Sequence, residues 1–416
     1  MVDKSLDLLL MVGSTGKMKA EEFLKKSLNK FEVEEDVKVN LRLVTWNRAY
    51  ESIISAFKSN NSPDVFQLGT TWVQTLSYLN YLHPIKNYNE EKNLLADWID
   101  DCCHYQEERY ALPWLIDTVI LAARKDIIDD LGIDINDLRT WQGFYKIYLD
   151  LVERRRRDPS FPKALSFSIR PDTDTLHRFM SWYFANNESF SLDIDSNKVL
   201  SNQTEILDTL KYLQTLIRSS DITVKDVDKH PYQLNEDFYK HGSYVFYLGH
   251  WYGVLLQILG QDSIISSDLE FIPLLIPSEN SQSSTNGGGS VLSVSSKTKH
   301  PILAQRLINF LCTEEFSEGW LKTTANTPAY ETRFWQKRHI DERISTLYNL
   351  VVNSKTYPFY PGWTNVENIL SDGISRCMWR LFDTGLNIDL DIKSLLSDID
   401  QSIVNILKMS WQKKNC

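Results

Sequence analysis

Apolar and polar positions at the start of the chain follow the pattern of strands that alternate with helices. Residues 6–12 and 64–68 are short apolar runs, and residues 36–44 alternate between apolar and polar side chains, as strands do. The residues between these runs, 18–31 and 50–58, are predicted helices. This order predicts an α/β lobe with a parallel sheet, in which ligands sit beyond the carboxyl ends of the strands.

Polar and aromatic residues follow each of the three predicted strands. The connecting segments are GSTGK (13–17), TWN (45–47) and GTTW (69–72). Because the carboxyl ends of parallel strands lie at one edge of the sheet, we expect hydroxyls, an amide and two tryptophans to gather there.

The segment GSTGK does not fit a phosphate-binding loop. Met11 and Met18 stand where that pattern requires a glycine and a hydroxyl residue. What remains is a predicted helix N-terminus with free amides and the hydroxyls of Ser14 and Thr15. Such a terminus can bind a carboxylate or a sugar hydroxyl.

The segment RYALPWLIDT (109–118) combines a proline, an aromatic residue and a carboxylate between two strand-like runs. Pro113 cannot donate a hydrogen bond to a sheet, so we expect a sheet to stop here or to have an edge here. One interpretation is a crossing between two sheets, with Trp114 and Asp117 lining a cleft. The other is a bent strand with a core tryptophan, and the segment alone leaves both open.

Strands and helices also alternate in the rest of the chain. A predicted strand at 243–248 ends at His250, Trp251 and Tyr252, and His250 is the one histidine that we place near a possible cleft. A polar loop at 277–289 precedes another strand. Four arginines at 154–157 fall at the C-terminal end of a predicted helix, where cations favour the helix dipole, so we expect a solvated helix end there.

Length and composition limit the class of protein. A chain of 416 residues exceeds one ordinary core, so two or three lobes are expected. The formal net charge of −10 argues against nucleic acid as a partner, because phosphate neutralisation needs a basic face. Twelve tryptophans and nineteen tyrosines suit planar or sugar-like ligands, although part of this excess can be core.

The tryptophans divide by their position in the predicted elements. Trp141 and Trp182 lie at helical positions and are predicted core residues. The others considered lie at strand ends or in loops beside glycine or proline, where an indole can stack on a pyranose. These predicted ligand contacts are Trp72, Trp114, Trp251 and Trp363.

Motifs for catalysis and metal binding are missing from the sequence. The five cysteines form no CxxC pair, and the eight histidines form no HExxH motif. There is no GxSxG, and neighbouring carboxylates such as Asp100 and Asp101 point apart. We therefore predict no catalytic residue, no cofactor and no metal, and a protein that is not an enzyme.

The sequence contains no run of about 18 apolar residues, so no membrane span is predicted. The start, MVDKSLDLLLMVGS, indicates a first strand because its apolar run is too short for a secretion signal. Either the chain is cytoplasmic or a signal has been removed.

Five segments, taken in order, resemble the family 1 extracellular solute-binding proteins, the maltose-binding-protein-like class that serves ABC transporters. Asn80, Arg109 and Gly143 depart from the family pattern, which has glycine, glycine and an acid there. The segments are NSPDVFQLGTTWVQTLSYLNYLHP, RYALPWLIDTVILAARKDIIDDLGI, TWQGFYKI, HGSYVFYLGHWY and GGGSVLSVSSKTKHPILAQRLINFLCTEE.

The resemblance implies an α/β, two-lobed periplasmic-binding-protein-like fold of type II, with a ligand cleft between the lobes and hinge crossings. The N-terminal lobe would comprise residues 1–113 and 272–325, and the C-terminal lobe residues 114–271 and 326–416. Pro113 would be the hinge. The implied ligands are sugars, most often oligosaccharides, bound without covalent chemistry.

The ligand-binding residues that we expect come from the strand ends and from positions matching the family pattern. They are Ser14, Thr15, Trp46, Asn47, Thr71, Trp72, Trp114, Asp117, Trp251, Tyr252, Gly288, Gly289 and Trp363.

The leading hypothesis is a non-catalytic protein that captures a carbohydrate and delivers it to the membrane permease of an ABC importer. We expect a monomer that binds no nucleic acid, located outside the cell, in the periplasm or on a lipid anchor after signal removal. A cytoplasmic location stays open because this chain shows no signal. The alternative is a ligand-sensing domain of the same fold that signals to a partner protein, and a glycosidase is the third hypothesis.

Overall fold

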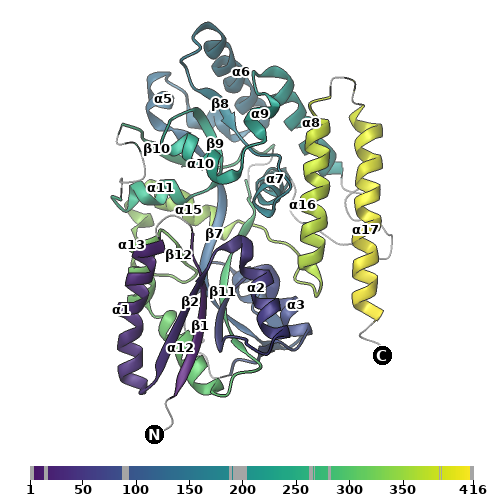
Figure 1. Ribbon diagram of the computed structural model, residues 1–416. Helices are drawn as coiled ribbons and strands as arrows, with labels where there is room; N and C mark the ends of the chain where they lie inside the picture. The colour runs from purple at the N-terminus through teal and green to yellow at the C-terminus, as the bar shows by residue number, and fades with distance from the viewer. Residues whose placement is uncertain are drawn as a thin grey trace. The chain divides into compact units, whose positions relative to one another are not determined.

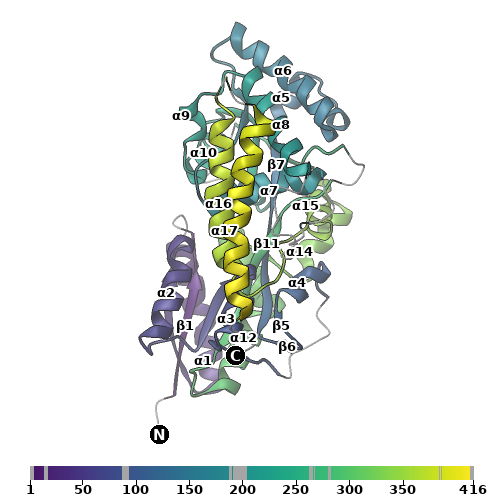
Figure 2. The ribbon, with the colours of Figure 1, turned by 90° about the vertical axis from the view of Figure 1, so that its right-hand side faces the viewer.

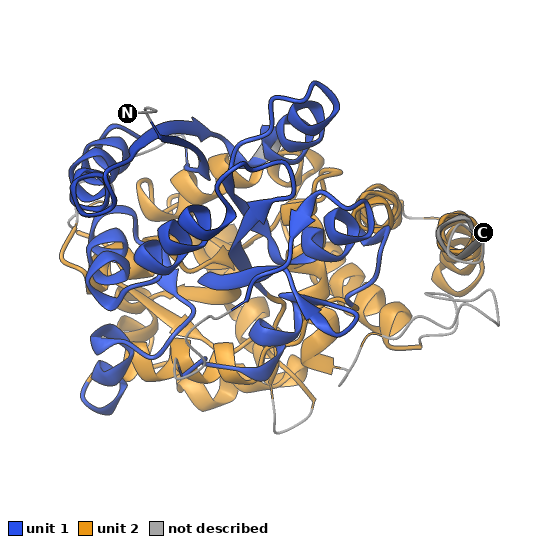
Figure 3. Cartoon of the chain, turned by 90° about the horizontal axis from the view of Figure 1, so that it is seen from below, with its two compact units in different colours: residues 1–117, 288–340, 359–363 blue, residues 118–287, 341–358, 364–416 orange. Residues whose placement is uncertain are grey.

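The computed structural model describes most of the chain and divides it into two compact units (Figure 3). Unit 1 comprises residues 1–117, 288–340 and 359–363, and unit 2 comprises residues 118–287, 341–358 and 364–416. The structure describes residues 4–13, 17–86, 93–186, 190, 204–261, 266, 268–279, 283–383, 385 and 387–412, apart from the side chains of residues 47 and 409–412.

A mixed sheet with helices on both faces forms unit 1 (Figure 1). Strand β1 pairs in parallel with β2 and β3, and β11 runs antiparallel to β3. The three predicted N-terminal strands are thus confirmed. The elements are β1 (Ser5–Met11), α1 (Lys17–Glu35), β2 (Lys38–Val44), α2 (Trp46–Lys58), β3 (Val65–Gly69), α3 (Val73–Tyr78), β4 (Leu82–His83), α4 (Asp97–Asp101), β11 (Gly287–Ser295), α12 (Pro301–Leu311) and α13 (Glu314–Thr324).

The period-two pattern of β1 explains the two cores of unit 1. Leu8 and Leu10 pack with α1, α12 and α13 on one face of the sheet. Leu9 and Met11 pack with α2 and α3 on the other. Because successive strand residues point to opposite faces, one apolar strand supports a helix layer on each side.

In unit 2, four strands pair with one another among the residues that the structure describes. Strand β9 pairs antiparallel with the second half of β7 and in parallel with β8, while β10 pairs antiparallel with β7. The elements are β7 (Ala111–Arg124), α5 (Lys125–Asp130), α6 (Trp141–Arg157), β8 (Lys163–Ser166), α7 (Thr173–Asn186), α8 (Thr204–Ser219), α10 (Pro231–Tyr239), β9 (Tyr244–His250), α11 (Tyr252–Ile258), β10 (Phe271–Leu274), α15 (Glu342–Val352), α16 (Trp363–Arg380) and α17 (Lys393–Gln412).

Strand β7 is continuous through Pro113, so the sheet does not stop at this proline. Its residues up to Asp117 belong to unit 1, and those from Thr118 belong to unit 2. The carbonyl of Pro113 accepts a hydrogen bond of 2.5 Å from the hydroxyl of Tyr330. The chain therefore passes between units four residues after the proline that we expected to be the hinge.

The predicted lobe boundaries differ from the two units in places that strand pairing explains. Residues 272–287 group with unit 2, where β10 pairs with Leu121–Arg124 of β7. Residues 326–340 group with unit 1, because β12 (Thr327–Pro328) pairs with Leu115 and Ile116. Both assignments follow from strand pairing, which the sequence alone does not reveal.

The two core tryptophans predicted in unit 2 are confirmed. Trp141 and Trp182 are buried, and Trp141 also donates a hydrogen bond of 2.8 Å to the carbonyl of Pro277. Within the part of the chain that the structure describes, no helix is both long enough and apolar enough to cross a membrane.

Two adjacent glycines at the start of β11 give a matched stability test. Gly289 has a φ of +145°, and a Cβ atom added there would lie 2.2 Å from the carbonyl oxygen of Leu115. A Cβ atom added to Gly288 meets nothing within 4 Å. Gly289→Ala should lower the free energy of unfolding by about 2–4 kcal/mol. Gly288→Ala should change it by about 0.5 kcal/mol or less. Urea denaturation of both variants measures the difference, and equal losses would contradict it.

Candidate functional site

Three aromatic side chains gather at the carboxyl ends of β2 and β3 in unit 1. Trp46 is the first residue of α2, and Trp72 ends the 3₁₀ turn that follows β3. Their ring centroids lie 6.2 Å apart, and that of Tyr50 lies 5.3 Å from Trp72, both with edge-to-face geometry. The structure therefore brings together the two tryptophans predicted at this edge. The side chain of Trp46 is 39% exposed, so part of its ring is open to a ligand.

A glycine allows Trp72 to lie against the backbone. A Cβ atom added to Gly69, the last residue of β3, would come within 3.2 Å of the Trp72 ring. Thr71, between the glycine and the tryptophan, is half-buried. The strand end thus presents an indole and a hydroxyl residue side by side.

Three of the predicted residues before the aromatic cluster cannot be placed. Ser14 and Thr15 lie outside the described residues, and Asn47 has a described backbone in α2 but no described side chain. Their predicted roles stay predictions.

Asp117 occupies a distinctive position in β7. The side chains of residues 111–116 and 118–123 are buried, whereas that of Asp117 is half-buried. The start of β11 lies beside this part of β7, since Gly289 packs against Leu115 and Ile116. Gly288 is half-buried and has open space at its Cα position. Unit 1 therefore has a half-buried carboxylate in β7 beside a half-buried stretch of backbone at the start of β11.

Trp114 belongs to the core of unit 1, so its predicted contact with a ligand is corrected. Its side chain is fully buried, and its Nε1 donates a hydrogen bond of 3.1 Å to the carbonyl of Leu311. The ring stacks on Trp320 with centroids 5.7 Å apart. Both faces of this region are filled by protein, which confirms the interpretation as a core tryptophan.

Trp251 and Trp363 are also buried. Trp251 lies between β9 and α11, and Trp363 is the first residue of α16. Their predicted stacking on a ligand stays a prediction. Tyr252, beside Trp251, is half-buried, and its burial raises the pKa of its hydroxyl.

A charged network at the end of β9 was not found by sequence reasoning. Asp174 in α7 accepts a hydrogen bond of 2.7 Å from Nε2 of His250 and one of 3.2 Å from Nη2 of Arg178. The same Nη2 donates to the hydroxyl of Tyr247 at 3.0 Å. Asp174 and Arg178 are four residues apart on one helix, which is a usable local signal. The partner His250 lies 76 residues further along the chain, so no spacing rule reveals it.

The charge of Asp174 is neutralised by this network. Burial alone would raise the pKa of its carboxyl group, but the guanidinium of Arg178 and the imidazole of His250 outweigh burial and hold that pKa well below its usual range. Asp174 is therefore ionised at neutral pH, and it anchors α7 to the end of β9. The charged side chains of this network in unit 2 are therefore paired with one another.

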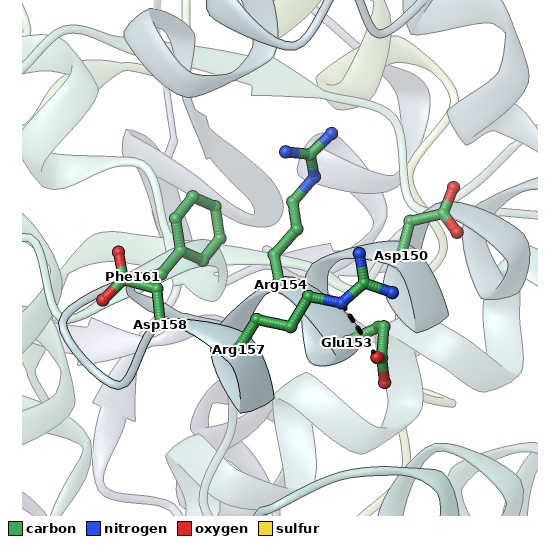
Figure 4. A pocket seen from close by; sticks show the side chains of 6 residues that line it. All are labelled: Asp150, Glu153, Arg154, Arg157, Asp158 and Phe161. Atoms are coloured by element: carbon green, nitrogen blue, oxygen red, sulfur yellow. Dashed lines mark hydrogen bonds and ion pairs between the residues drawn. The ribbon is translucent and has the colours of Figure 1, made fainter.

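A surface hollow at the end of α6 in unit 2 is lined by charges of both signs (Figure 4). Nε of Arg157 lies 3.1 Å from a carboxylate oxygen of Glu153. Arg154, Arg155, Arg156 and Arg157 occupy the last turn of α6, as predicted for a solvated helix end. Among the residues that the structure describes, no group of three His, Cys, Asp or Glu side chains is placed to hold a metal ion.

Comparison with known proteins identifies relatives of this chain. The sequence model of the family described as bacterial extracellular solute-binding protein matches residues 15–316. The diacetylchitobiose binding protein DasA of Streptomyces coelicolor is 22% identical over 347 residues, which cover 81% of this chain and 77% of DasA.

Solved structures share the fold across nearly the whole chain. A solute-binding protein of an ABC transporter from Thermotoga lettingae, bound to α-D-tagatose, has a TM-score of 0.79 at 16% identity and covers 97% of this chain and 100% of its own. The sugar-binding protein MalE of Xanthomonas citri has a TM-score of 0.75 at 18% identity, covering 99% of each chain. The fold is thus the two-lobed α/β fold predicted from the sequence.

The ion pair of Asp174 predicts a pH-dependent contribution to stability. Because the folded-state pKa lies below the unfolded value, the ionised carboxylate stabilises the fold above about pH 4, and this contribution is lost as the pH falls through the folded pKa. Asp174→Asn leaves the buried Arg178 without its anion and should cost about 3–5 kcal/mol at pH 7. The deficit relative to the wild type should shrink below about pH 4.

Chemical denaturation between pH 3 and pH 8 measures this deficit. Asp228→Asn is the matched control, because the Asp228 side chain is 52% exposed and lies 3.8 Å from Arg170. It should cost about 1 kcal/mol or less. A deficit for Asp174→Asn that did not depend on pH would contradict the assignment.

Proposed function

Because this chain belongs to the bacterial extracellular solute-binding protein family, we propose that it binds a carbohydrate, leaves it chemically unchanged and delivers it to an ABC importer. The relatives support a saccharide as the ligand class. DasA is named for diacetylchitobiose, and the structure from Thermotoga lettingae holds α-D-tagatose.

The observation that carries the proposal is the aromatic cluster of Trp46, Tyr50 and Trp72. A pyranose ring has apolar C–H faces and polar edges, so it stacks on an indole while its hydroxyls bind neighbouring polar groups. Trp46 is partly exposed, and its ring packs edge-to-face against that of Trp72, with 6.2 Å between the two centroids. We assign stacking on the ligand to this cluster.

Polar groups of unit 1 supply the hydrogen bonds in this proposal. Thr71, Asp117 and the backbone of Gly288 and Gly289 are half-buried, and we propose that they contact the hydroxyls of the ligand. A carboxylate accepts strong hydrogen bonds from sugar hydroxyls. Ser14, Thr15, Asn47 and Tyr252 are retained as proposed ligand contacts on sequence position.

The family supports a proposal for the partner and the location. We propose that the protein acts as a monomer outside the cytoplasmic membrane and docks on the permease of its importer. No step of this cycle requires a catalytic residue, a cofactor or a metal.

Binding to a panel of saccharides tests the function. Isothermal titration calorimetry with tagatose, maltose, maltotriose and diacetylchitobiose should give saturable binding for at least one class. Bound ligand should raise the midpoint temperature of unfolding, and the increase should grow with the logarithm of the ratio of ligand concentration to Kd. Absence of both responses across the panel, and across monomers and oligomers of glucose, xylose and N-acetylglucosamine, would refute a carbohydrate ligand.

Two tryptophan substitutions separate the ligand site from the core. Trp46→Leu should weaken binding of the best ligand about two- to tenfold, because aromatic stacking contributes about 0.5–1.5 kcal/mol beyond buried area. Trp114→Leu should lower the free energy of unfolding by about 2–4 kcal/mol and leave Kd within about twofold, because this indole is fully buried against Trp320 and Leu311. Calorimetry and urea denaturation of both variants check the assignment, and it fails if Trp46→Leu binds normally.

A further inference from the structure

Helix α7 is buried on every side within unit 2. Residues 178–185 are all buried, and they make up more than two helical turns. A helix buried all round is normally apolar all round, because a buried hydroxyl costs free energy unless it is hydrogen-bonded. Ser181 lies in the middle of this stretch and is 0% exposed. The partners of its hydroxyl therefore show why a serine stands there.

The contacts of Ser181 lead from α7 to two other segments of unit 2. Its hydroxyl donates to the carbonyl of His177, one turn earlier, at 2.8 Å, and its Oγ accepts a hydrogen bond of 3.2 Å from the amide of Asn286. Oγ1 of Thr285 lies 3.1 Å from Oγ of Ser181 and donates to the carbonyl of Val119 at 2.7 Å. One buried hydroxyl thus joins α7 to residues 285–286 and, through Thr285, to β7.

The residues joined by Ser181 stand beside places where the chain passes between the two units, which we call passages. Val119 is the second residue of unit 2 after the passage at Asp117, and Asn286 is the last but one before the passage at Gly287. The amide of Val119 also donates to the carbonyl of Asn286 at 3.4 Å. The two segments are therefore bonded both to α7 and to each other.

A third segment that reaches a passage is bonded to the same group. The amide of Lys355 donates to the carbonyl of Thr285 at 2.8 Å, and the carbonyl of Lys355 accepts a hydrogen bond of 2.7 Å from the amide of Gly287. Lys355 stands three residues before the passage at Pro358. Hydrogen bonds therefore hold three such segments together inside unit 2.

Helix α7 contacts further passage residues through His177. The ring centroid of His177 lies 5.7 Å from that of Tyr357, and its Nε2 lies 3.3 Å from a carboxylate oxygen of Glu367. Tyr357 and Glu367 stand on the two sides of residues 359–363, which belong to unit 1. In Figure 2, α7 lies close to β7, with α16 nearer to the viewer. Two positions one turn apart on α7 thus contact chain beside several passages.

Helix α7 is itself fixed within unit 2. Asp174, near its N-terminal end, accepts the hydrogen bond of 2.7 Å from Nε2 of His250. At its other end, the carbonyl of Ala185 accepts a hydrogen bond from the hydroxyl of Ser278. A helix held near both ends is a firm support for segments bonded to its middle.

We propose that Ser181 is a positioning residue that ties the passage segments to α7, so that their ends in unit 2 move as one body. A change in the arrangement of the units then bends the chain at the passages and not inside unit 2. Without the tie, the segments would move separately, and more conformations would have to be ordered when a ligand binds. The inference goes beyond the proposed function, because the tie does not depend on the chemistry of the ligand.

Hydrogen exchange of the full chain without ligand, followed by mass spectrometry, tests the tie. Ser181→Ala removes the acceptor of one amide and loosens the segments bonded to it. Exchange should become about ten- to hundredfold faster at these amides, and stay unchanged elsewhere in unit 2. Thr285→Val should have the same effect, whereas Thr285→Ser keeps the hydroxyl and should keep the wild-type rates. The amides are those of Val119, Asn286, Gly287 and Lys355.

Thr209→Val is the matched control. Thr209 is as deeply buried as Ser181, and its hydroxyl also donates to the carbonyl four residues earlier in its helix, that of Glu205, at 2.7 Å. This variant should leave the rates of the four amides unchanged. Because Ser181 and Thr285 act in one network, combining Ser181→Ala with Thr285→Val should add less than the sum of the two single effects.

Binding separates a positioning role from a purely structural one, and this readout rests on the proposed function. In calorimetric titrations with tagatose, maltose, maltotriose and diacetylchitobiose, Ser181→Ala should bind the best ligand of the wild type about two- to tenfold more weakly. Thr209→Val should bind it within about twofold of the wild type.

Each outcome has a distinct meaning. Unchanged exchange at the four amides in both Ser181→Ala and Thr285→Val overturns the tie. Faster exchange with normal binding by Ser181→Ala overturns the positioning role. A wild type that binds no saccharide contradicts the proposed function, and the exchange rates then still decide on the tie.

Discussion

The position of β7 is the constraint on which the fold depends. It is one 14-residue strand that supplies pairing partners in both units, to β12 before Asp117 and to β9 and β10 after it. The side chains of β7 are buried on both faces of the strand, so the strand is apolar almost throughout. A charged side chain within such a strand costs free energy unless a partner or solvent compensates it. The half-buried Asp117 is that exception, which is why its position points to function.

Local pattern predicted the architecture but not the direction of each side chain. The strands β1, β2 and β3 and the tryptophans that follow two of them were predictable, because alternation and strand ends are local properties. Trp114 was assigned to a cleft from its proline neighbour. Asp117 stands three positions after Trp114, and an odd difference in position along a strand places two side chains on opposite faces. Period two therefore already argued that both could not line one cleft.

Contacts between distant segments could not be predicted from one sequence. His250 was singled out by its strand-end position, but its partner Asp174 stands on another element, and Arg178 completes the network from within α7. This arrangement leaves no periodic signal, because periodicity records which face of an element is buried and not what buries it.

The arrangement of charged side chains in the two units favours an uncharged ligand. In unit 2, the carboxylate of Asp174 is neutralised by Arg178 and His250, so its charge serves the fold. In unit 1, the groups that we propose as ligand contacts are an indole, a threonine, a carboxylate and backbone. A carboxylate repels anions and accepts hydrogen bonds from hydroxyls, and an indole stacks favourably on apolar ring faces. A ligand that satisfies both has hydroxyls at its edge and C–H groups on its face, which describes a neutral sugar.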